Sequence, residues 1–134
     1  MSNLTRTPVN PAPWSQNFGF NLGEVVTGES RTLYIAGQTA MSDEGAPQHA
    51  DDMRGQMALA MDDLNAVLAA ADMDLTNVVR LTIMSTDMDA TMQNFDVIAA
   101  RLGQAGAMPP QTMMGVTRLA LPELMFEVEA VAVA

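Results

Sequence analysis

The sequence predicts a two-layer α+β domain, in which two helices pack on one face of a mixed sheet. Two helix-like segments, residues 50–71 and 91–102, alternate with short runs rich in β-branched residues. The predicted element order is ββαβαββ, and two helices on one face of a sheet form the simplest two-layer arrangement. The 134 residues fit a single domain, 1–134, and a hydrophobic fraction of 49% is enough to build its core.

The N-terminal part of the chain predicts an extended leader followed by a β-hairpin. Residues 8–13 contain three prolines, which lack an amide donor and fix φ, so this segment is expected to lie extended on the surface. Residues 18–26 predict a first strand weakened by two glycines, and residues 32–36 predict a second strand rich in β-formers. The turn-forming residues 27–30 predict that these two strands pair with each other.

Residues 50–71 have the clearest periodicity in the chain. Asp51 and Asp52 precede the apolar pattern and suit the N-terminal turn of a helix electrostatically. The second helix, residues 91–102, carries apolar residues on one side and is expected to stop at Gly103. Spacings of three and four place a set of apolar residues on one face of the first helix: Met53, Met57, Met61, Leu64, Leu68 and Ala71.

Three further strands complete the predicted sheet. They cover residues 78–84, 112–118 and 124–133, and the last of them alternates with valines. Because two helices can cover only one face of the sheet, association with other copies of the chain is expected to cover the other face. A mean hydropathy of +0.10 fits either apolar surface buried between subunits or a core rich in Met and Ala.

Composition and charge exclude several classes of function. A net charge of −10, with six scattered arginines and no lysine, disfavours nucleic-acid partners and excludes a lysine Schiff base. The absence of cysteine excludes thiolate chemistry, and the single histidine, His49, cannot build a histidine metal site, so neither a metal nor another cofactor is expected. The chain has no membrane-spanning apolar run and no signal-peptide core, which predicts a cytoplasmic protein without a membrane partner.

Five segments, taken in order, resemble the Rid (YjgF) family over nearly the whole chain. The most specific are Ala36-Gly37-Gln38 and the ending Glu127-Val128-Glu129-Ala130, found together at this spacing. The resemblance implies a chorismate-mutase-like fold and a homotrimer with pockets between neighbouring subunits. It also implies hydrolysis of reactive enamines and imines. The five segments are Pro13–Gln16, Leu33–Gln38, residues 56–71 with Val78–Leu81, Pro109–Thr112, and Glu127–Val133.

The resemblance also assigns candidate site residues. Trp14 stands where the family has an aromatic residue, usually tyrosine, and the backbone amides of Ala36 and Gly37 would contact a ligand. Asp89 corresponds to a polar residue, often asparagine, at the start of the second helix. Glu127 matches the family's glutamate and would act on the attacking water.

Structural roles fit the same residues. Trp14 could be a packing anchor, and Asp89 could be a helix N-cap. Gly37 could be required for its backbone conformation alone, and Glu127 and Glu129 could form a solvent-facing pair on one side of a strand.

Gln111 departs from the family pattern, because deaminating members place an arginine at this position. That arginine would grip a substrate carboxylate through two charge-assisted hydrogen bonds. Glutamine has no charge, and losing such a pair costs about 2–5 kcal/mol. Arg118 has the opposite strand parity and is expected to face away, whereas Met113 shares the parity of Gln111 and would make the pocket more apolar. The resemblance therefore implies a substrate that is neutral or cationic.

These observations favour a Rid-like hydrolase of a small enamine or imine, acting in clefts between subunits with an altered substrate preference. The alternative is a non-catalytic trimer that binds a small neutral or hydrophobic molecule in the same clefts. A ribonuclease, an activity attached to the family by some labels, is disfavoured by the acidic charge and by the lack of His and Lys catalytic groups.

Overall fold

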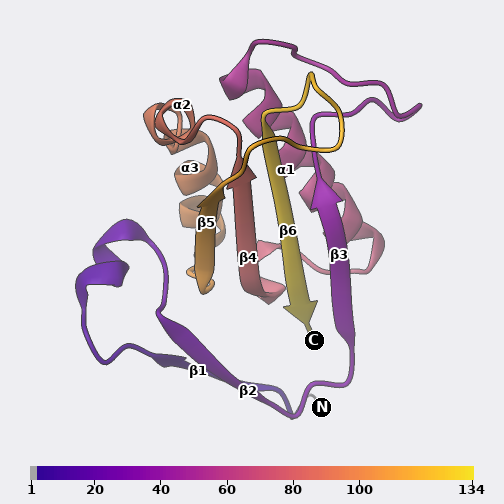
Figure 1. Ribbon diagram of the computed structural model, residues 1–134. Coiled ribbons are helices and arrows are strands. Elements are labelled where there is room, and N and C mark those ends of the chain that lie inside the picture. Colours follow the sequence, from indigo (N-terminus) through magenta and orange to yellow (C-terminus); the bar gives the residue numbers. More distant parts are fainter. Residues whose placement is uncertain (1–2) are drawn as a thin grey trace.

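A computed structural model describes residues 3–134, which form a four-stranded mixed sheet with three α-helices on one of its faces and a separate two-stranded ribbon (Figure 1). The four strands lie in the order β3 (Thr32–Gln38), β6 (Phe126–Val133), β4 (Val78–Ser85) and β5 (Gln111–Gly115). Strand β6 runs antiparallel to both β3 and β4, and β4 and β5 are parallel. The predicted α+β class and mixed sheet are confirmed.

Helix α1, Met53–Ala70, forms the centre of the core. The carboxylate of Asp52 caps its first turn by accepting a hydrogen bond from the Gly55 N–H at 2.9 Å. The apolar face predicted for this helix is confirmed, since four of its residues have no exposed surface: Met57, Met61, Leu64 and Leu68.

Strand β6 supplies the opposite side of the core through its alternation. Its residues Phe126, Val128, Ala130 and Ala132 are buried among the core residues. The residues between them, beginning with Glu127, therefore point to the face of the sheet away from the helices. The strand begins at Phe126, two residues later than the sequence predicts.

The second predicted helix is two helices, α2 (Met88–Gln93) and α3 (Asp96–Ala105). The side-chain amide of Asn94 donates to the Ala90 carbonyl at 2.8 Å, beside its own backbone N–H at 3.2 Å, and Asn94 leaves helical geometry with a φ of −111°. Gly103 lies inside α3, so its predicted role as a stop was wrong. The helix ends at Gly106, which has a φ of 71° and is followed by a hydrogen bond from the Ala107 N–H to the Leu102 carbonyl at 2.9 Å.

The predicted hairpin between residues 18–26 and 32–36 was wrong. Strand β2 (Gly23–Thr27) instead pairs with β1 (Thr5–Val9), and the two form a separate ribbon joined by the 3-10 helix η1 (Trp14–Phe18). The predicted extended leader, residues 8–13, thus begins within a strand, since Pro8 lies in β1. Both strands of a two-stranded ribbon are edge strands, where a proline is tolerated.

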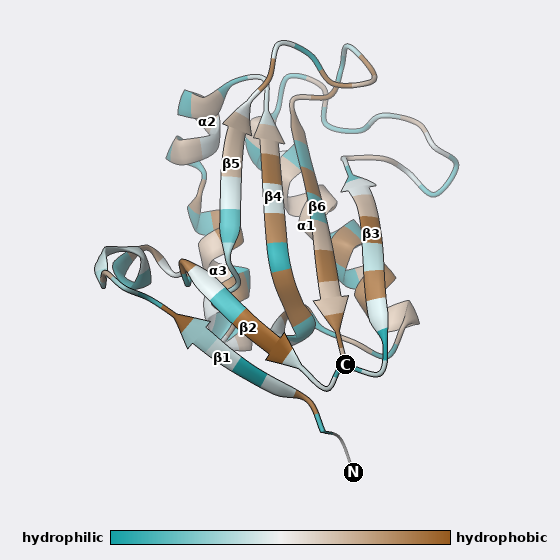
Figure 2. Cartoon of the chain, turned by 60° about the horizontal axis from the view of Figure 1, so that its bottom comes forward, coloured by the Kyte–Doolittle hydropathy of each residue, from teal (hydrophilic) through white to brown (hydrophobic). Residues whose placement is uncertain are grey.

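Arg6 ties this ribbon to the main sheet. Its guanidinium forms an ion pair with Glu24 across the ribbon and donates to the carbonyls of Thr76 and Val78, the latter at 3.0 Å. These two acceptors lie at the 3-10 turn η2 (Leu75–Asn77) and the start of β4. The ribbon therefore crosses the end of the sheet close to the C-terminus (Figure 2).

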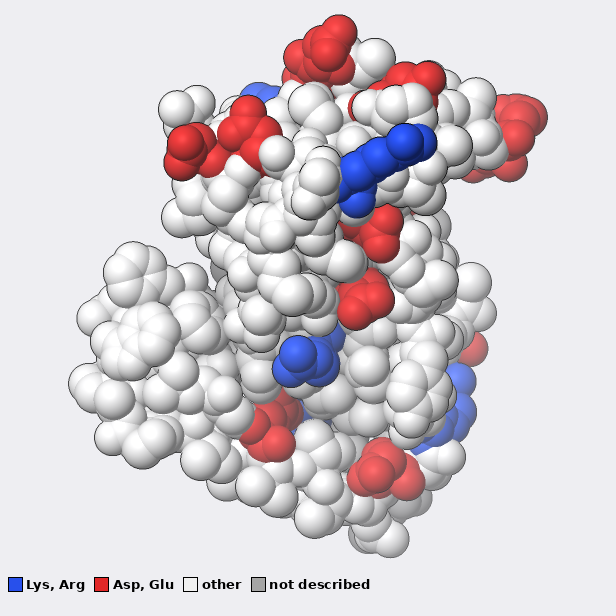
Figure 3. Space-filling view, viewed as in Figure 1, with Lys and Arg blue, Asp and Glu red and all other residues white. Residues whose placement is uncertain are grey.

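The face of the sheet away from the helices, here the open face, is covered by no helix of residues 3–134. Tyr34 on this face is 79% exposed. Charged side chains of both signs lie over the central strands, whereas the lobe that contains η1 is uncharged in this view (Figure 3). The strand register assigns these residues to the open face: Tyr34, Arg80, Thr82, Met84, Thr112, Met114, Glu127, Glu129 and Val131.

None of the helices in residues 3–134 combines the length and the apolar character that a membrane span requires.

The buried amide of Gln56 provides a test of the fold. It has no exposed surface and makes three hydrogen bonds, donating to the carbonyls of His49 (3.1 Å) and Glu123 (2.8 Å) and accepting from the Met125 N–H (2.8 Å). Gln56→Leu leaves these backbone groups unpaired and is expected to lower the free energy of unfolding by about 2–5 kcal/mol. Urea unfolding at fixed protein concentration measures the change.

The matched control is Gln93→Leu, because Gln93 is exposed on α2. It is expected to change the free energy of unfolding by less than about 0.5 kcal/mol. Equal losses in the two variants would contradict a special role for Gln56.

Candidate functional site

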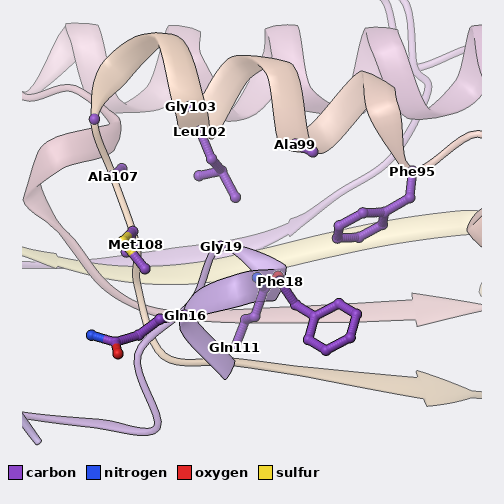
Figure 4. Close-up of a pocket in the computed structure, with 11 residues that line it drawn as sticks. Gln16, Phe18, Gly19, Phe95, Ala99, Leu102, Gly103, Ala107, Met108 and Gln111 are labelled. Carbon is purple, nitrogen blue, oxygen red and sulfur yellow. The ribbon is translucent and has the colours of Figure 1, made fainter. Parts of the chain in front are cut away.

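Two uncharged cavities adjoin each other between η1, α3 and the start of β5. One, here the slot, has a volume of about 290 Å³ and lies between η1 and α3. The other, here the outer cavity, has a volume of about 560 Å³ and extends toward Met92 and Met113. In Figure 4, Phe95, which precedes α3, and Leu102 of α3 point toward η1, and Gln111 extends from β5 toward Phe18. Both cavities share Phe18, Gly19, Phe95, Ala99 and Gln111.

Aromatic side chains form the walls of the outer cavity. Three of the four phenylalanines in the chain, Phe18, Phe20 and Phe95, line it, whereas Phe126 is the one that lies in the core. Among the residues described, those lining the two cavities include no acidic or basic side chain. Residues 7–23, which carry η1, contain no charged residue. The site therefore suits a ligand that is uncharged or largely apolar.

Sequence reasoning missed the phenylalanines and Ala99. A signal was available in the composition, because a chain with only four phenylalanines and thirteen methionines builds its core mainly from leucine, methionine, alanine and isoleucine. Phenylalanines beside a glycine in an uncharged segment, as at Phe18 and Phe20, are then candidates for a binding surface. The approach of Phe95 to them depends on the tertiary fold.

Gln111 and Met113 face the helix side of the sheet. In the parallel pairing of β4 with β5, Gln111 is opposite Leu81 and Met113 is opposite Ile83, and both partners are fully buried core residues. Their shared parity, predicted from the spacing, is present in the structure, and both line the outer cavity. The Oε1 atom of Gln111 is buried without a hydrogen-bond partner. Buried acceptors of this kind are uncommon in folded proteins and invite a functional explanation.

Trp14 supports the aromatic wall from outside. Its ring meets Phe18 edge-on at 6.4 Å and Phe20 at 5.6 Å between centroids, and 52% of its surface is exposed. It lines neither of the two cavities in this chain. Its direct contact with a ligand therefore stays a prediction, while the packing role is visible.

Glu127 and Gly37 form a second element of the site, on the open face. The register of β3 on β6 shifts between Ile35 and Gln38, which leaves Ala36 and Gly37 exposed in an irregular edge segment. The Glu127 side chain lies directly against Gly37, where an added Cβ would come within 2.1 Å of its Oε2 atom. Glycine at position 37 thus provides the space that the carboxylate occupies.

The environment of Glu127 changes its acidity. Partial burial raises the pKa of this carboxyl group, and the negative charge of Glu129 raises the pKa further. A carboxyl group with a raised pKa is a better proton acceptor when ionised than an ordinary surface glutamate. This property suits a group that takes a proton from water.

The two elements do not meet within one chain. Glu127 lies opposite Met84, which lies opposite Met114 on β5, so all three share the open face. Gln111 is three residues away from Met114 and points to the other face. With neighbouring strands about 4.8 Å apart and about 3.3 Å per residue along a strand, the Cα atoms of Gln111 and Glu127 lie roughly 14 Å apart.

Two other predicted positions lie away from both elements. Asp89 is exposed in the first turn of α2 and does not cap it, because Asp87 accepts the capping hydrogen bond from the Ala90 N–H at 3.1 Å. Arg118 follows β5, which ends at Gly115 rather than at residue 118, and donates to the Leu119 carbonyl at 3.3 Å. Because Arg118 lies outside the strand, the prediction that strand alternation turns it away from Gln111 does not apply. Arg118 nevertheless lines neither cavity.

Known proteins are similar to this chain over nearly its whole length. The family model described as Endoribonuclease L-PSP matches residues 19–134. The RutC family protein YjgH of Escherichia coli is 28% identical over 129 residues, covering 96% of this chain and 95% of the relative. The chain belongs to the YjgF/Rid family.

Solved structures of this family have the same fold. YyfB of Yersinia pestis, a Rid protein of unknown function, has a TM-score of 0.83 and 33% identity and covers 100% of both chains. Rv2704 of Mycobacterium tuberculosis, of the YjgF/YER057c/UK114 family, has a TM-score of 0.64 and 25% identity, covering 97% of this chain and 100% of that one. The predicted family membership and chorismate-mutase-like fold are confirmed.

The contact between Gly37 and Glu127 is directly testable. Gly37→Ala places a methyl group where the carboxylate lies, so it is expected to push Glu127 into solvent and to lower its pKa toward the ordinary value. The overlap is expected to reduce the free energy of unfolding by about 1–3 kcal/mol. NMR titration of the Glu127 carboxyl group and urea unfolding measure the two effects.

Adding Glu127→Ala to the Gly37→Ala chain removes the clashing atoms and is expected to recover most of the stability. The control Gly115→Ala places its Cβ in open space. An unchanged Glu127 pKa in Gly37→Ala would show that the close contact is not what buries the carboxyl group.

Proposed function

We propose that this YjgF/Rid protein hydrolyses small enamines or imines in clefts between the subunits of a homotrimer, with Glu127 acting on the attacking water. Membership of the family and the carboxyl group held against Gly37 support the proposal. The observation that carries it is this half-buried carboxylate with a raised pKa beside an exposed, irregular backbone segment.

The chemistry requires little machinery. An enamine first tautomerises to an imine, whose carbon is already electrophilic. Water adds to that carbon while the Glu127 carboxylate accepts a proton from the water. Transfer of that proton to nitrogen gives a carbinolamine, which carries a hydroxyl and an amino group on the same carbon. The hydroxyl proton then passes to nitrogen, the C–N bond breaks, ammonia leaves, and the carbonyl group of a ketone or an aldehyde forms. The backbone at Ala36 and Gly37 would hold the substrate or the water beside the carboxylate.

Gln111 would set the substrate preference. In deaminating relatives that have an arginine at this position, the guanidinium would pair with a substrate carboxylate. Here the amide is neutral, and the cavity around it contains no charged side chain among its lining residues. A substrate carboxylate would lose hydration without gaining an ion pair, so we propose a substrate without that group.

A complete site would need two copies of the chain. Gln111 and Met113 face the helix side at one edge of the sheet, whereas Glu127 faces the open side next to the other edge strand. Association through the exposed open face would bring the edge of one chain against the Glu127 element of the next. Closed rings with a repeated heterologous interface have this property.

The apolar lining favours a second candidate, in which the trimer binds a small neutral molecule without converting it. Three phenylalanines and Met113 form a surface that could hold such a ligand with no chemistry. Ribonuclease activity is not proposed, because a chain with a net charge of −10 repels a phosphate backbone.

Substrate preference distinguishes these candidates. With 2-iminopropionate generated in situ, the natural chain is expected to give little acceleration, and Gln111→Arg is expected to raise kcat/KM by about 30-fold or more, because a carboxylate–arginine pair contributes at least about 2 kcal/mol. A neutral imine generated from a simple primary amine is expected to show the reverse preference.

Glu127→Gln is the matched control for the chemical step, since it keeps the size of the side chain and removes the base. It is expected to lower kcat by about 100-fold or more on the preferred imine. An unchanged rate would remove Glu127 from the mechanism, and the absence of turnover with both imines in every variant would favour the binding protein.

Mixing two inactive variants tests whether the site is shared between chains. Ala99→Trp fills both cavities, whereas Glu127→Gln removes the base. Refolding the two together is expected to restore about one quarter of the natural rate per site, because random assembly gives one interface in four with both halves intact. No recovery in mixtures that native mass spectrometry shows to be mixed would contradict a shared site.

A further inference from the structure

We infer that the slot between η1 and α3 is a subsite for an uncharged apolar chain, and that the Gln111 amide at its mouth receives a neutral head group that donates an N–H. The ligand class is therefore a carboxylate-free imine, or a stable amide analogue of one, with an aliphatic chain of several carbons. This inference rests on the proposed function in using the same site, and it specifies the substrate that the site selects.

Small residues on α3 keep the slot open. Ala99 and Gly103 are four positions apart, so they lie on the same face of the helix, and both line the slot. A Cβ at Gly103 would meet no atom within 4 Å, so close packing does not require glycine there. Glycine inside a helix is nevertheless less favourable than alanine. The result of having glycine at this position is a wider slot.

The walls of the slot are apolar throughout most of their length. Leu102, Ala107 and Met108 contribute to them together with the aromatic rings of Phe18 and Phe95. Burial of each methylene of a chain in such surroundings strengthens binding. The slot contains no charged residue among those that line it, so a charged tail would gain no partner.

Gln111 favours one kind of head group. It is the polar side chain that lines both the slot and the outer cavity, so it lies within reach of a ligand held in either. Its Oε1 atom is buried and has no hydrogen-bond partner. A turn of the amide would expose this oxygen, which would then accept a hydrogen bond from an imine or amide N–H of the ligand. An ionised carboxylate has only acceptors, so it could pair with the amide N–H group alone and would gain no opposite charge there.

Binding of primary carboxamides of increasing length, measured by calorimetry on the full chain, tests the inference. Butanamide, hexanamide and octanamide are stable analogues of the neutral imines, and the matching carboxylates differ only in the head group. Affinity for the amides is expected to rise about three- to fourfold for each added methylene until the slot is filled. Each carboxylate is expected to bind at least about tenfold more weakly than its amide.

A matched pair of variants locates the chain-binding surface. Ala99 and Ala100 are adjacent and exposed on the same helix, but only Ala99 lines the slot. Ala99→Leu is expected to abolish the gain from butanamide to octanamide, while Ala100→Leu keeps it. As a second variant, Gly103→Leu is expected to shorten the longest amide accommodated, and Gly103→Ala provides its control for helix stability.

The outcomes separate this inference from the proposed function. Affinities that do not depend on chain length, equal effects of Ala99→Leu and Ala100→Leu, a preference for carboxylates, or no binding of any amide would each overturn the inference. A clear length dependence with no hydrolysis of the matching imines would refute the proposed hydrolase and leave the subsite intact. Hydrolysis of neutral imines without any length dependence would refute the subsite alone.

Discussion

Side chains alternate between the two faces along each strand, and this alternation assigns every residue of the sheet either to the core or to the open face. It buries Phe126, Val128 and Ala130 against α1 and thereby commits Glu127 to the opposite face. Gln111 of β5 lies opposite the buried residue Leu81 of β4, so the same alternation places Gln111 on the helix side of the sheet. The proposed base and the proposed substrate-selecting amide are separated in this way, so a single chain would not bring both to one small molecule. The separation of these two side chains and the uncovered face of the sheet thus have a common origin.

The aromatic cavity depends on a different kind of contact, the attachment of the N-terminal ribbon. Arg6 pairs with Glu24 of the ribbon and donates to carbonyl groups at the start of β4, so it anchors the ribbon to the main sheet. Helix η1 lies between the two strands of this ribbon in the chain. A core built largely from methionine and aliphatic side chains leaves the phenylalanines free to line the surface between η1 and α3. The outcome is an apolar site on a protein whose net charge is −10. Gln111 is the polar side chain that both cavities share, and its Oε1 atom is buried without a hydrogen-bond partner.

Much of the fold could be predicted from local pattern. Helix α1 follows from its apolar repeat and from the cap at Asp52, and β6 follows from its alternation, because each depends on residues close together in the chain. The ribbon could not be predicted, since Arg6 finds its partners eighteen and about seventy residues away. The break between α2 and α3 falls at Asn94, whose φ of −111° is a local backbone feature that the hydropathy pattern does not reveal.

The family, the α+β class, the absence of an arginine at position 111 and the shared parity of Gln111 and Met113 follow from residue identity and spacing alone. The folded chain was needed to show that Gly37 makes room for the Glu127 carboxylate and that three phenylalanines meet around Gln111. It was also needed to show that Gln111 and Glu127 point to opposite faces of the sheet. These features depend on contacts between segments distant in the chain, whose geometry is fixed only when the strands pair and the helices pack.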